Sequence, residues 1–459
     1  MSIDTRQSKI GKRVLVAGLG KSGVAAANWL ARQGARVTVS DKQDESAFDR
    51  RLLGELSRGG IELELGDHRL GSFAETDLIV VSPGVPLDIM PLVEASKRGV
   101  PIIGELELAW RYLRTPGIAV TGTNGKSTVV KLIEEMLSRG GRKVFVGGNI
   151  DFPLTDYIGG AQDADYVVLE ISSFQLDTVE TFSPLVALIL NISPDHLDRY
   201  TDYESYVRSK ERIFGNQGPE QILILNDDDP VLGTLEPKEG PRVYRYGMER
   251  KEGRQAFLKD GRIVVGLDGH RGLTFDLDRF ALPGIHNHAN VMAAILGALV
   301  IDTPPVAIQE GIDGFKGLPH RIELIDTIGG VAFYNDSKAT NIDSAIKSIA
   351  SFSRPVVLIA GGRHKGSDYL PLVNAATGRV KDAVFVGESS NLLATAFNGT
   401  IPWSVVRSMD DAVIRAYDRA QEGDVVLLAP ACSSFDMFRN YQHRGMAFQE
   451  AVRRLRDGI

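Results

Sequence analysis

The sequence contains a single cysteine, Cys432, in 459 residues. One cysteine excludes an intrachain disulfide and a zinc site built on several cysteines, and we expect this thiol to be structural rather than nucleophilic.

Long apolar runs are also missing, because the longest, Val291–Ile301, falls well short of the roughly 18 residues that span a bilayer. The charged first residues lead straight into a glycine turn and do not resemble a signal peptide. We therefore expect a cytoplasmic protein without membrane insertion.

Positive charge is not in excess either. Lys and Arg number 52 against 59 Asp and Glu, which gives a formal charge of −7. A nucleic-acid-binding protein usually presents a basic face, so we expect no nucleic-acid partner. The length corresponds to about three domains at roughly 150 residues each.

The chain repeats a buried strand, a glycine turn and a helix. Arg13–Ala17 and Ile118–Thr121 are almost continuously apolar, which is typical of parallel strands covered on both faces. Thr115–Gly117 and Gly314–His320 are candidate linkers. The stretch Arg242–Phe275 is strand-like but irregular and is assigned only loosely to the central part. The pattern predicts an α/β protein with mainly parallel sheets and three domains, at residues 1–115, 116–318 and 319–459.

A glycine-rich loop, Gly18-x-Gly20-x-x-Gly23, follows the first strand and opens a helix. Its glycines let the backbone approach a diphosphate, and the helix N-terminus presents N–H donors to it. Asp41 ends the next strand, where an acid commonly accepts hydrogen bonds from a ribose. We interpret the loop as a nucleotide-diphosphate site. The motif does not distinguish NAD(P) from another nucleotide, and a tight turn without a ligand stays open as the alternative.

A second loop, GTNGKST, joins a strand to a helix at residues 122–128. It lacks the full GxxxxGK[ST] spacing because position 120 is valine. Its backbone N–H groups can still cradle phosphates, while Lys126 can reach the β and γ oxygens and Ser127 can ligate Mg²⁺. We predict an ATP site, against the alternative of a glycine turn beside a surface lysine. The predicted phosphate-binding residues are Gly122, Thr123, Asn124, Gly125, Lys126, Ser127 and Thr128.

Three further features lie in the same part of the chain. Glu170 ends an apolar strand, which places it on the ligand side of a parallel sheet, where it could hold Mg²⁺; alone, such a residue is more often a solvated strand end. The loop Asn191–Asp198 brings His196 together with two carboxylates and is either a plain polar loop or a metal or catalytic loop. Lys210, judged from its neighbours alone, is an ordinary solvated helix lysine.

The last third of the chain carries three polar runs, each placed after a predicted strand. They are Asn335–Asn341, Gly361–Gly366 and Ala429–Asp436. Because the carboxyl ends of parallel strands meet at one edge of a sheet, we expect these loops to form a binding rim.

Taken together, these segments resemble the Mur ligases, the ATP-dependent amino-acid ligases of peptidoglycan precursor synthesis. The resemblance runs in order over nearly the whole chain. Its last segments point to the branch that adds D-glutamate to UDP-N-acetylmuramoyl-L-alanine through an acyl phosphate. The matching segments are GTNGKST, LEISSFQL, NISPDHLDRY, KERIF, LPGIHNHAN, GLPHR, YNDSKATN and APACSSFD.

The resemblance implies Rossmann-like first and last domains around a P-loop ATPase domain, small-molecule substrates, ATP, two Mg²⁺ ions and a monomer. The catalytic group would be Lys126, Glu170, His196 and Lys210. Metal ligands would be Ser127, Glu170, His196 and Lys210 in a carbamylated form. UDP-substrate ligands would be Gly18, Gly20, Lys21, Ser22, Gly23, Asp41, Lys42, Asn149 and His196. The adenosine side would be Asn287, Asn290, Arg321 and Asp336, and D-glutamate would meet Lys338, Thr340, Lys365, Ser434, Phe435 and Tyr441.

Some positions and some functions stay open. Asp151, Arg363 and His364 depart from the pattern that the resemblance leads us to expect, so we assign them no role. A sibling Mur ligase, or a ligase like folylpolyglutamate synthetase, would add another amino acid. Outside this class, the first glycine loop fits an NAD(P)-dependent oxidoreductase, and a nucleotide-sensing module without catalysis is a third reading.

Overall fold

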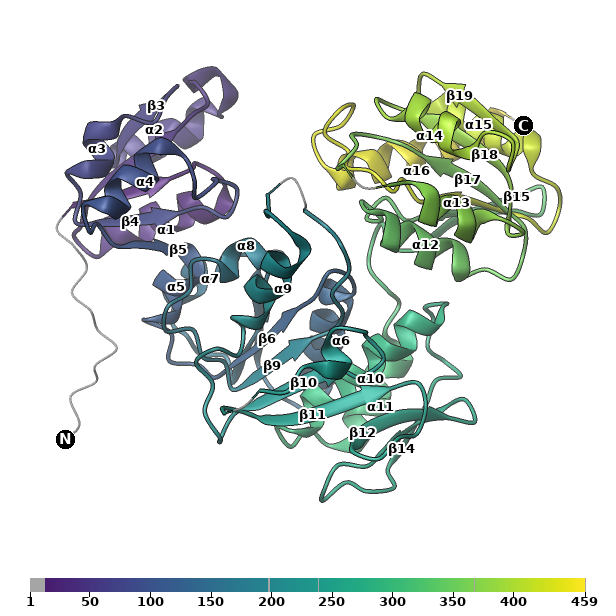
Figure 1. Ribbon diagram of the computed structural model, residues 1–459, viewed down its shortest axis with the longest axis horizontal. Coiled ribbons are helices and arrows are strands. Elements are labelled where there is room, and N and C mark those ends of the chain that lie inside the picture. The colour runs from purple at the N-terminus through teal and green to yellow at the C-terminus, as the bar shows by residue number, and fades with distance from the viewer. Residues whose placement is uncertain (1–12, 197–198, 238, 367, 459) are drawn as a thin grey trace.

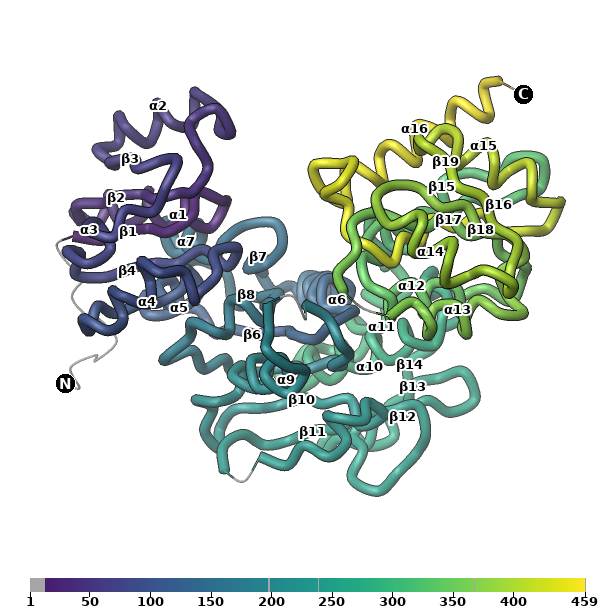
Figure 2. Tube along the Cα trace, turned by 45° about the horizontal axis from the view of Figure 1, so that its top comes forward, coloured from purple at the N-terminus to yellow at the C-terminus, as the bar shows by residue number. Residues whose placement is uncertain are grey.

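The computed structural model describes residues 13–196, 199–237, 239–366 and 368–458. Three sheets form three lobes, and the N-terminal and C-terminal lobes flank the central lobe on opposite sides (Figures 1 and 2). Asp198 of the predicted polar loop and the first twelve residues lie outside the described residues. In the part of the chain that the structure describes, no helix is long and apolar enough to cross a membrane.

The N-terminal lobe contains one sheet of five parallel strands in the order β3-β2-β1-β4-β5. This is the strand order of a Rossmann fold, as predicted. The strands are β1 (Arg13–Ala17), β2 (Arg36–Asp41), β3 (Glu62–Leu65), β4 (Leu78–Val81) and β5 (Ile102–Gly104). The helices are α1 (Lys21–Arg32), η1 (Glu45–Ala47), α2 (Arg50–Arg58), α3 (Leu70–Ala74), α4 (Met90–Lys97) and α5 (Glu105–Trp110).

The central lobe contains a nine-stranded sheet in the order β14-β13-β12-β11-β10-β9-β6-β8-β7. Its strands are β6 (Gly117–Thr121), β7 (Val144–Gly148), β8 (Tyr166–Glu170), β9 (Val186–Ile189), β10 (Ile222–Asn226), β11 (Arg242–Gly247), β12 (Arg254–Lys259), β13 (Arg262–Val265) and β14 (Thr274–Asp276). Its helices are α6 (Lys126–Arg139), α7 (Leu154–Ile158), α8 (Ser173–Leu176), α9 (Tyr203–Glu211), η2 (Leu232–Thr234), α10 (Ile285–Leu299) and α11 (Pro305–Gly314). The irregular stretch is thus four strands, of which β12, β13 and β14 pair antiparallel.

The C-terminal lobe contains a six-stranded sheet in the order β15-β16-β20-β17-β18-β19. Only β15 pairs antiparallel among these strands. The strands are β15 (Glu323–Ile328), β16 (Val331–Asn335), β17 (Val356–Ala360), β18 (Val380–Val386), β19 (Trp403–Val406) and β20 (Val425–Leu428). The helices are α12 (Ile342–Ala350), α13 (Leu370–Ala376), α14 (Ser390–Phe397), α15 (Met409–Arg419) and α16 (Tyr441–Gly458).

The lobes differ in how their apolar cores meet. One buried cluster runs from the N-terminal sheet through α5 and α7 into one face of the central sheet, with Leu106 and Leu154 among its members. A second cluster fills the other face of the central sheet against α6, α10 and α11. The C-terminal lobe keeps two separate clusters of its own. The N-terminal lobe is therefore joined to the centre by apolar packing, whereas the C-terminal lobe meets it largely through polar side chains.

Candidate active site

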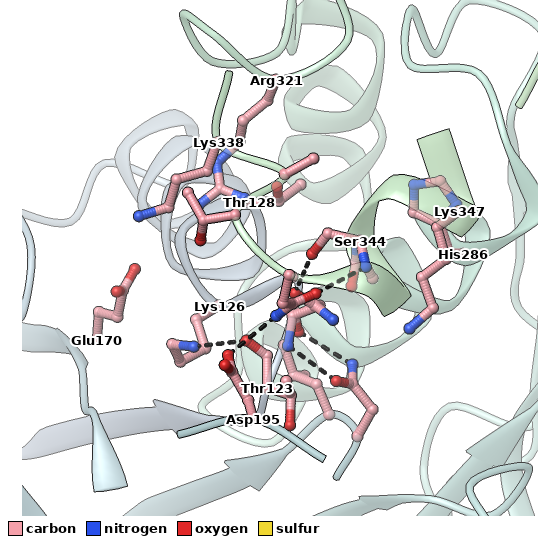
Figure 3. A pocket seen from close by; sticks show the side chains of 18 of the residues that line it. Thr123, Lys126, Thr128, Glu170, Asp195, His286, Arg321, Lys338, Ser344 and Lys347 are labelled. Atoms are coloured by element: carbon pink, nitrogen blue, oxygen red, sulfur yellow. Dashed lines mark hydrogen bonds between the residues drawn. The ribbon is translucent and has the colours of Figure 1, made fainter. Parts of the chain in front are cut away.

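A cavity of about 580 Å³ lies where the carboxyl ends of β6, β8 and β9 face the C-terminal lobe (Figure 3). It is lined by predicted site residues from both lobes. They are Thr123, Asn124, Gly125, Lys126, Thr128, Asn149, Glu170, His196, Lys210, Asn287, Asn290, Arg321, Asp336, Lys338, Thr340, Lys365 and Phe435. The structure thus brings together most of the residues assigned to ATP, metal and amino acid.

The phosphate loop joins β6 to α6 in a tightly packed turn. Gly125 precedes α6 with φ 87°, and a Cβ there would lie 2.4 Å from Oδ1 of Asn290, so glycine is required on two counts. The ammonium of Lys126 donates to the carbonyl oxygens of Gly122 at 2.7 Å and Thr123 at 2.9 Å. This lysine is folded back over the loop, where burial lowers its pKa.

Glu170 is buried, with 1% of its surface exposed, so the alternative of a solvated strand end is wrong. Its carboxylate accepts hydrogen bonds from the hydroxyl of Ser127 and from Nδ2 of Asn149, the latter at 2.8 Å. Burial alone would raise the pKa of Glu170, but the ammonium groups of Lys126 and Lys338 and these hydrogen bonds hold it below its usual value. The site therefore contains a buried carboxylate that stays ionised.

Lys210 is also buried, with 1% exposed, and its reading as a solvated helix lysine is wrong. Its Nζ donates to the carbonyl oxygen of Gly122 at 3.0 Å, the same oxygen that accepts from Lys126. Nζ also lies 4.6 Å from the centre of the Tyr206 ring. Burial, and then the neighbouring charge of Lys126, lower the pKa of Lys210 well below its usual value. A lysine with such a depressed pKa is a neutral amine over a wider pH range than an exposed one.

The donor set suits magnesium bound together with a phosphate ligand. Among the described residues, no group of three or more His, Cys, Asp or Glu side chains is arranged to hold a metal. Mg²⁺ is commonly held by one or two carboxylates plus substrate phosphates rather than by an all-protein cage. The hydroxyl of Ser127 and the carboxylate of Glu170, in direct contact at the phosphate loop, fit that pattern.

The C-terminal lobe contributes cations to the opposite wall. Burial lowers the pKa of Lys338 to about 7, and its Nζ lies 4.1 Å from the centre of the Tyr441 ring. Nζ of Lys365 lies 3.4 Å from Oδ1 of Asp195 in the central lobe. Burial raises the pKa of Asp336 to about 6, and its carboxylate accepts from the hydroxyl of Ser348.

Two residues assigned to the amino acid do not line this cavity. Ser434 is buried, with 2% exposed, and Tyr441 reaches the cavity only through its contact with Lys338. Arg321 lines the wall and donates to the hydroxyl of Ser127 at 2.7 Å, which ties the C-terminal lobe to the predicted metal ligand.

Cys432 is buried beside the hydroxyls of Tyr369 and Ser389, in keeping with a structural thiol.

The first glycine loop forms a separate site in the N-terminal lobe. A Cβ at Gly23 would lie 1.9 Å from the carbonyl oxygen of Gly18, whereas one at Gly20 would meet nothing within 4 Å. Asp41 accepts hydrogen bonds from the backbone N–H groups of Leu19 at 2.7 Å and Gln43 at 2.9 Å, so it braces the loop.

A smaller cavity of about 130 Å³ adjoins this glycine loop. Lys21 and Ser22 line it together with Asn149, which also lines the larger cavity. Asn149 thus connects the two sites, whereas Asp41 and Lys42 line neither cavity.

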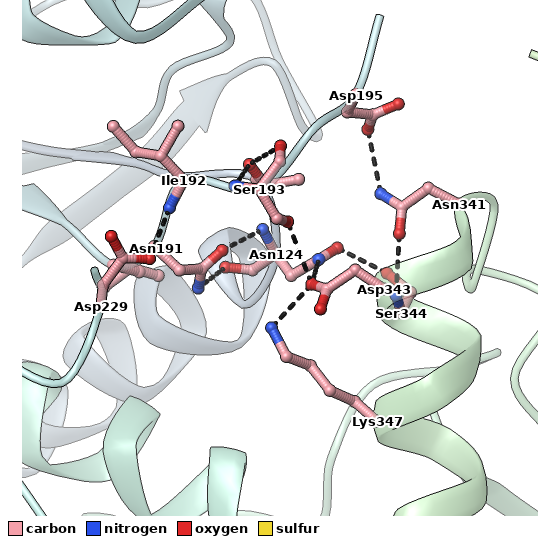
Figure 4. Close-up of polar contacts among 12 residues, drawn as sticks. Asn124, Asn191, Ile192, Ser193, Asp195, Asp229, Asn341, Asp343, Ser344 and Lys347 are labelled. Carbon is pink, nitrogen blue, oxygen red and sulfur yellow. Dashed lines mark hydrogen bonds and ion pairs between the residues drawn. The ribbon is translucent and has the colours of Figure 1, made fainter. Parts of the chain in front are cut away.

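Sequence reasoning missed several polar residues that border the cavity. Asp343 and Ser344, in the first turn of α12, bind Asn124 of the central lobe, and Lys347 pairs with Asp343 one turn further along (Figure 4). Asn341, which belongs to a polar run that the sequence did single out, donates to Asp195 of the central lobe. An acid in the first turn of a helix is expected from the helix dipole alone. The sequence therefore carried no signal that separated Asp343 from an ordinary helix start.

Comparison with known proteins gives matches over nearly the whole chain. Residues 12–104 match the Mur ligase MurD-like N-terminal domain, residues 120–298 the Mur ligase middle domain, and residues 320–432 the Mur ligase glutamate ligase domain. The UDP-N-acetylmuramoylalanine–D-glutamate ligase of Geotalea daltonii is 42% identical, covering 98% of both chains. The ligase of the same name from Acidobacterium capsulatum is 45% identical, covering 96% of both. A MurF ligase of Thermotoga maritima solved with ADP shares the fold, with a TM-score of 0.60, 16% identity, and coverage of 96% of this chain and 95% of that one.

Proposed function

Because the chain belongs to the Mur ligase family, we propose that it joins D-glutamate to UDP-N-acetylmuramoyl-alanine and converts ATP to ADP and phosphate. The observation that carries this proposal is the identity of 42–45% to D-glutamate ligases over at least 96% of the chain. The geometry of the cavity agrees, since a phosphate loop and a cation-rich wall from another lobe face each other there. We assign the three tasks of binding the UDP substrate, ATP and amino acid to residues 1–115, 116–318 and 319–459.

The first step is phosphoryl transfer. The terminal carboxylate of the UDP substrate attacks the γ-phosphorus of ATP, the bond to the bridging oxygen breaks, and ADP leaves. Such transfers depend on in-line positioning and on neutralisation of charge rather than on covalent help from the protein. Lys126, held at the mouth of the phosphate loop by Gly122 and Thr123, supplies a fixed positive charge.

Magnesium, when bound, neutralises phosphate charge and orients the transferring group. We assign its ligands to Ser127, Glu170, His196 and Lys210. The buried, ionised carboxylate of Glu170 beside the Ser127 hydroxyl supports the first site.

We assign the second metal site to a carbamate on Lys210. Carbamate formation requires the neutral amine to attack carbon dioxide, and the buried Lys210 beside Lys126 has the depressed pKa that favours this form. The product is an anionic group with two oxygens, which matches the preference of Mg²⁺ for oxygen.

The second step joins the amino acid. The amine of D-glutamate attacks the acyl carbon, the carbon–oxygen bond to phosphate breaks, and the nitrogen loses a proton. We assign recognition of D-glutamate to Lys338, Thr340, Lys365, Ser434, Phe435 and Tyr441, and of adenosine to Asn287, Asn290, Arg321 and Asp336. Lys365 supports this assignment because it reaches the cavity edge as an ammonium opposite a carboxylate, that of Asp195.

The UDP end of the acceptor is assigned to the first glycine loop. The open space at the Gly20 Cβ position allows a diphosphate to approach the backbone, and Lys21 and Ser22 line the adjoining cavity. Asn149 links that cavity to the phosphate loop and supports a path for the muramoyl-alanine part. We place the reaction in the cytoplasm and the enzyme as a monomer.

The test is ADP release measured across acceptors and amino acids. We expect release only with ATP, Mg²⁺, UDP-N-acetylmuramoyl-L-alanine and D-glutamate together. Efficient use of L-alanine, L-lysine or D-alanine would instead identify a sibling ligase. Oxidation of NADPH by the substrates, with no ADP release, would identify an oxidoreductase.

A further inference from the structure

The start of α12 holds a residue of the phosphate loop through contacts that the proposed chemistry does not use (Figure 4). Nδ2 of Asn124 donates to Oδ2 of Asp343 at 2.6 Å, and the hydroxyl of Ser344 donates to Oδ1 of Asn124 at 2.5 Å. Asn124 belongs to the central lobe, whereas Asp343 and Ser344 belong to the C-terminal lobe. Both ends of the Asn124 amide are therefore bound across the interface between two lobes.

Asp343 is fixed by two more hydrogen bonds. Its Oδ2 also accepts from the hydroxyl of Ser193 at 3.1 Å and from Nζ of Lys347, one turn along α12, at 2.7 Å. The side chain of Asp343 is 30% exposed, so solvent screens these contacts only in part. Hydrogen bonds to an ionised carboxylate are stronger than neutral ones, and three donors converge on one oxygen here.

The backbone of Asn124 is held from the opposite side. Its N–H donates to Oδ1 of Asn191 at 2.9 Å, and its carbonyl oxygen accepts from Nδ2 of Asn191 at 3.0 Å. Asn191 follows β9 within the central lobe. The loop is therefore anchored within its own lobe by its backbone and across the interface by its side chain, two residues before Lys126.

We propose that Asp343 is a positioning residue for phosphoryl transfer, which holds Asn124 across the interface and so couples docking of the C-terminal lobe to the geometry of the phosphate loop. The inference rests on the proposed function. Through Asp343, the lobe to which we assign the amino acid directly contacts the loop to which we assign ATP. A small displacement of reacting groups can cost about a hundredfold in rate, so this contact acts on turnover rather than on binding of the UDP substrate.

The first test compares two matched substitutions, Asp343→Ala and Asp410→Ala. Asp343 and Asp410 each occupy the second position of a helix, α12 and α15, but Asp410 pairs with Arg454 within the C-terminal lobe. We expect Asp343→Ala to lower kcat at least about tenfold, the effect of losing a hydrogen bond to a charged group. Its KM for the UDP substrate and the turnover of Asp410→Ala should each stay within about twofold of wild type, as for surface changes. Equal kcat in the two variants would overturn the proposal.

The second test reverses the pair and does not depend on the first variant folding well. Asn124→Asp places two carboxylates face to face, and adding Asp343→Asn restores a donor opposite an acceptor. The double variant should therefore turn over faster than Asn124→Asp alone, whereas the two losses would add if Asp343 did not act through Asn124. A double variant no faster than Asn124→Asp contradicts the inference.

Wild-type activity in the same assay distinguishes a failure of the positioning role of Asp343 from a failure of the proposed function. Active wild type with Asp343→Ala equal to Asp410→Ala overturns the positioning role and leaves the proposed function standing. Wild type that releases no ADP with D-glutamate and the UDP substrate overturns both.

Discussion

The glycine loop after β1 and the glycine loop after β6 both join a parallel strand to the N-terminus of a helix, yet their partners come from different places. The first is braced within its own lobe, where Asp41 accepts from the N–H of Leu19. The second is completed from the C-terminal lobe, which binds Asn124 through α12 and Ser127 through Arg321. The apolar cores follow the same division, since only the N-terminal lobe shares its core with the centre.

This difference in where the loops find their partners indicates how one local motif, a glycine loop before a helix, can serve two tasks. A loop that is complete within its own lobe can hold a substrate at any stage of the reaction. A loop that needs a second lobe is complete only when that lobe has docked, and in the proposed reaction docking would also exclude water from the acyl phosphate. The comparison therefore predicts binding at the first loop and chemistry at the second.

The largest effect is expected from removing the lysine of the second loop, which tests whether the chemistry takes place there. Lys126→Ala should lower kcat about 10²–10³-fold, the usual result of deleting one preorganised charge contact in a transition state. Its fold should be retained, because the two hydrogen bonds of its ammonium run to carbonyl oxygens of its own loop. Steady-state ADP release measures the effect, and Lys131→Ala, on the same helix but paired with Asp151 at the surface, is the control. Near-normal turnover in folded Lys126→Ala would falsify the assignment.

Lys210, buried beside the second loop, provides a further test of the difference between the loops. We assign it to a metal site, and no residue of the first loop is assigned to a metal. Lys210→Ala should lose roughly 10²-fold in activity, and small carboxylates such as formate should restore part of the rate. Lys210→Arg, which keeps the positive charge, should be equally inactive because it cannot form the carbamate. These rates are compared at saturating Mg²⁺. A fully active Lys210→Arg variant is incompatible with the carbamate.

The cation at the edge of the C-terminal lobe tests whether that lobe recognises the amino acid. Lys365→Ala should raise the KM for D-glutamate about ten- to a hundredfold, since a hydrogen bond between charged groups is lost. The KM for ATP should change far less, and D-glutamine should be a poor substrate in wild type because its side chain lacks the charge that would pair with Lys365. Apparent KM values for both substrates decide the matter. Equal changes in the KM for D-glutamate and the KM for ATP would instead favour a sibling ligase that adds another amino acid.

The first glycine loop should show smaller effects, and two of its glycines, Gly20 and Gly23, should differ. Gly23→Ala places a methyl group against the Gly18 carbonyl and should cost about 1–3 kcal/mol of stability. Gly20→Ala enters open space, so it should leave the melting temperature nearly unchanged and raise the KM for the UDP substrate. Thermal unfolding and steady-state kinetics on the pair distinguish the two. A Gly20→Ala variant with an unchanged KM would show that no diphosphate approaches there.

Much of this design was visible in the sequence because its signals are local. The prediction of a strand at Arg13–Ala17 agrees with β1, and a helix, α6, follows the phosphate loop as predicted. The helix after the first glycine loop begins at Lys21, inside the Gly18–Gly23 motif, because Gly20 serves as its cap. The strand β3 was missed, since it is only four residues long, lies at the edge of its sheet and buries none of its side chains fully.

The features that were not predictable depend on contacts between distant segments. Burial of Lys210 follows from α9 packing beneath a loop 88 residues earlier in the chain, and its composition gives no sign of this. The antiparallel edge of the central sheet likewise depends on pairing among short strands within an irregular stretch. Asp343 needs a partner 219 residues away to acquire its proposed role.

The most direct test of the central claim is calorimetric titration of the two nucleotides into wild type and into Lys21→Ala. We expect two independent sites in wild type, one for UDP-N-acetylmuramoyl-L-alanine and one for a non-hydrolysable ATP analogue. Lys21→Ala should weaken binding of the UDP substrate and leave binding of the ATP analogue unchanged. Competition between the two nucleotides for one site, or equal weakening of both, would contradict the division of binding and chemistry between the two loops.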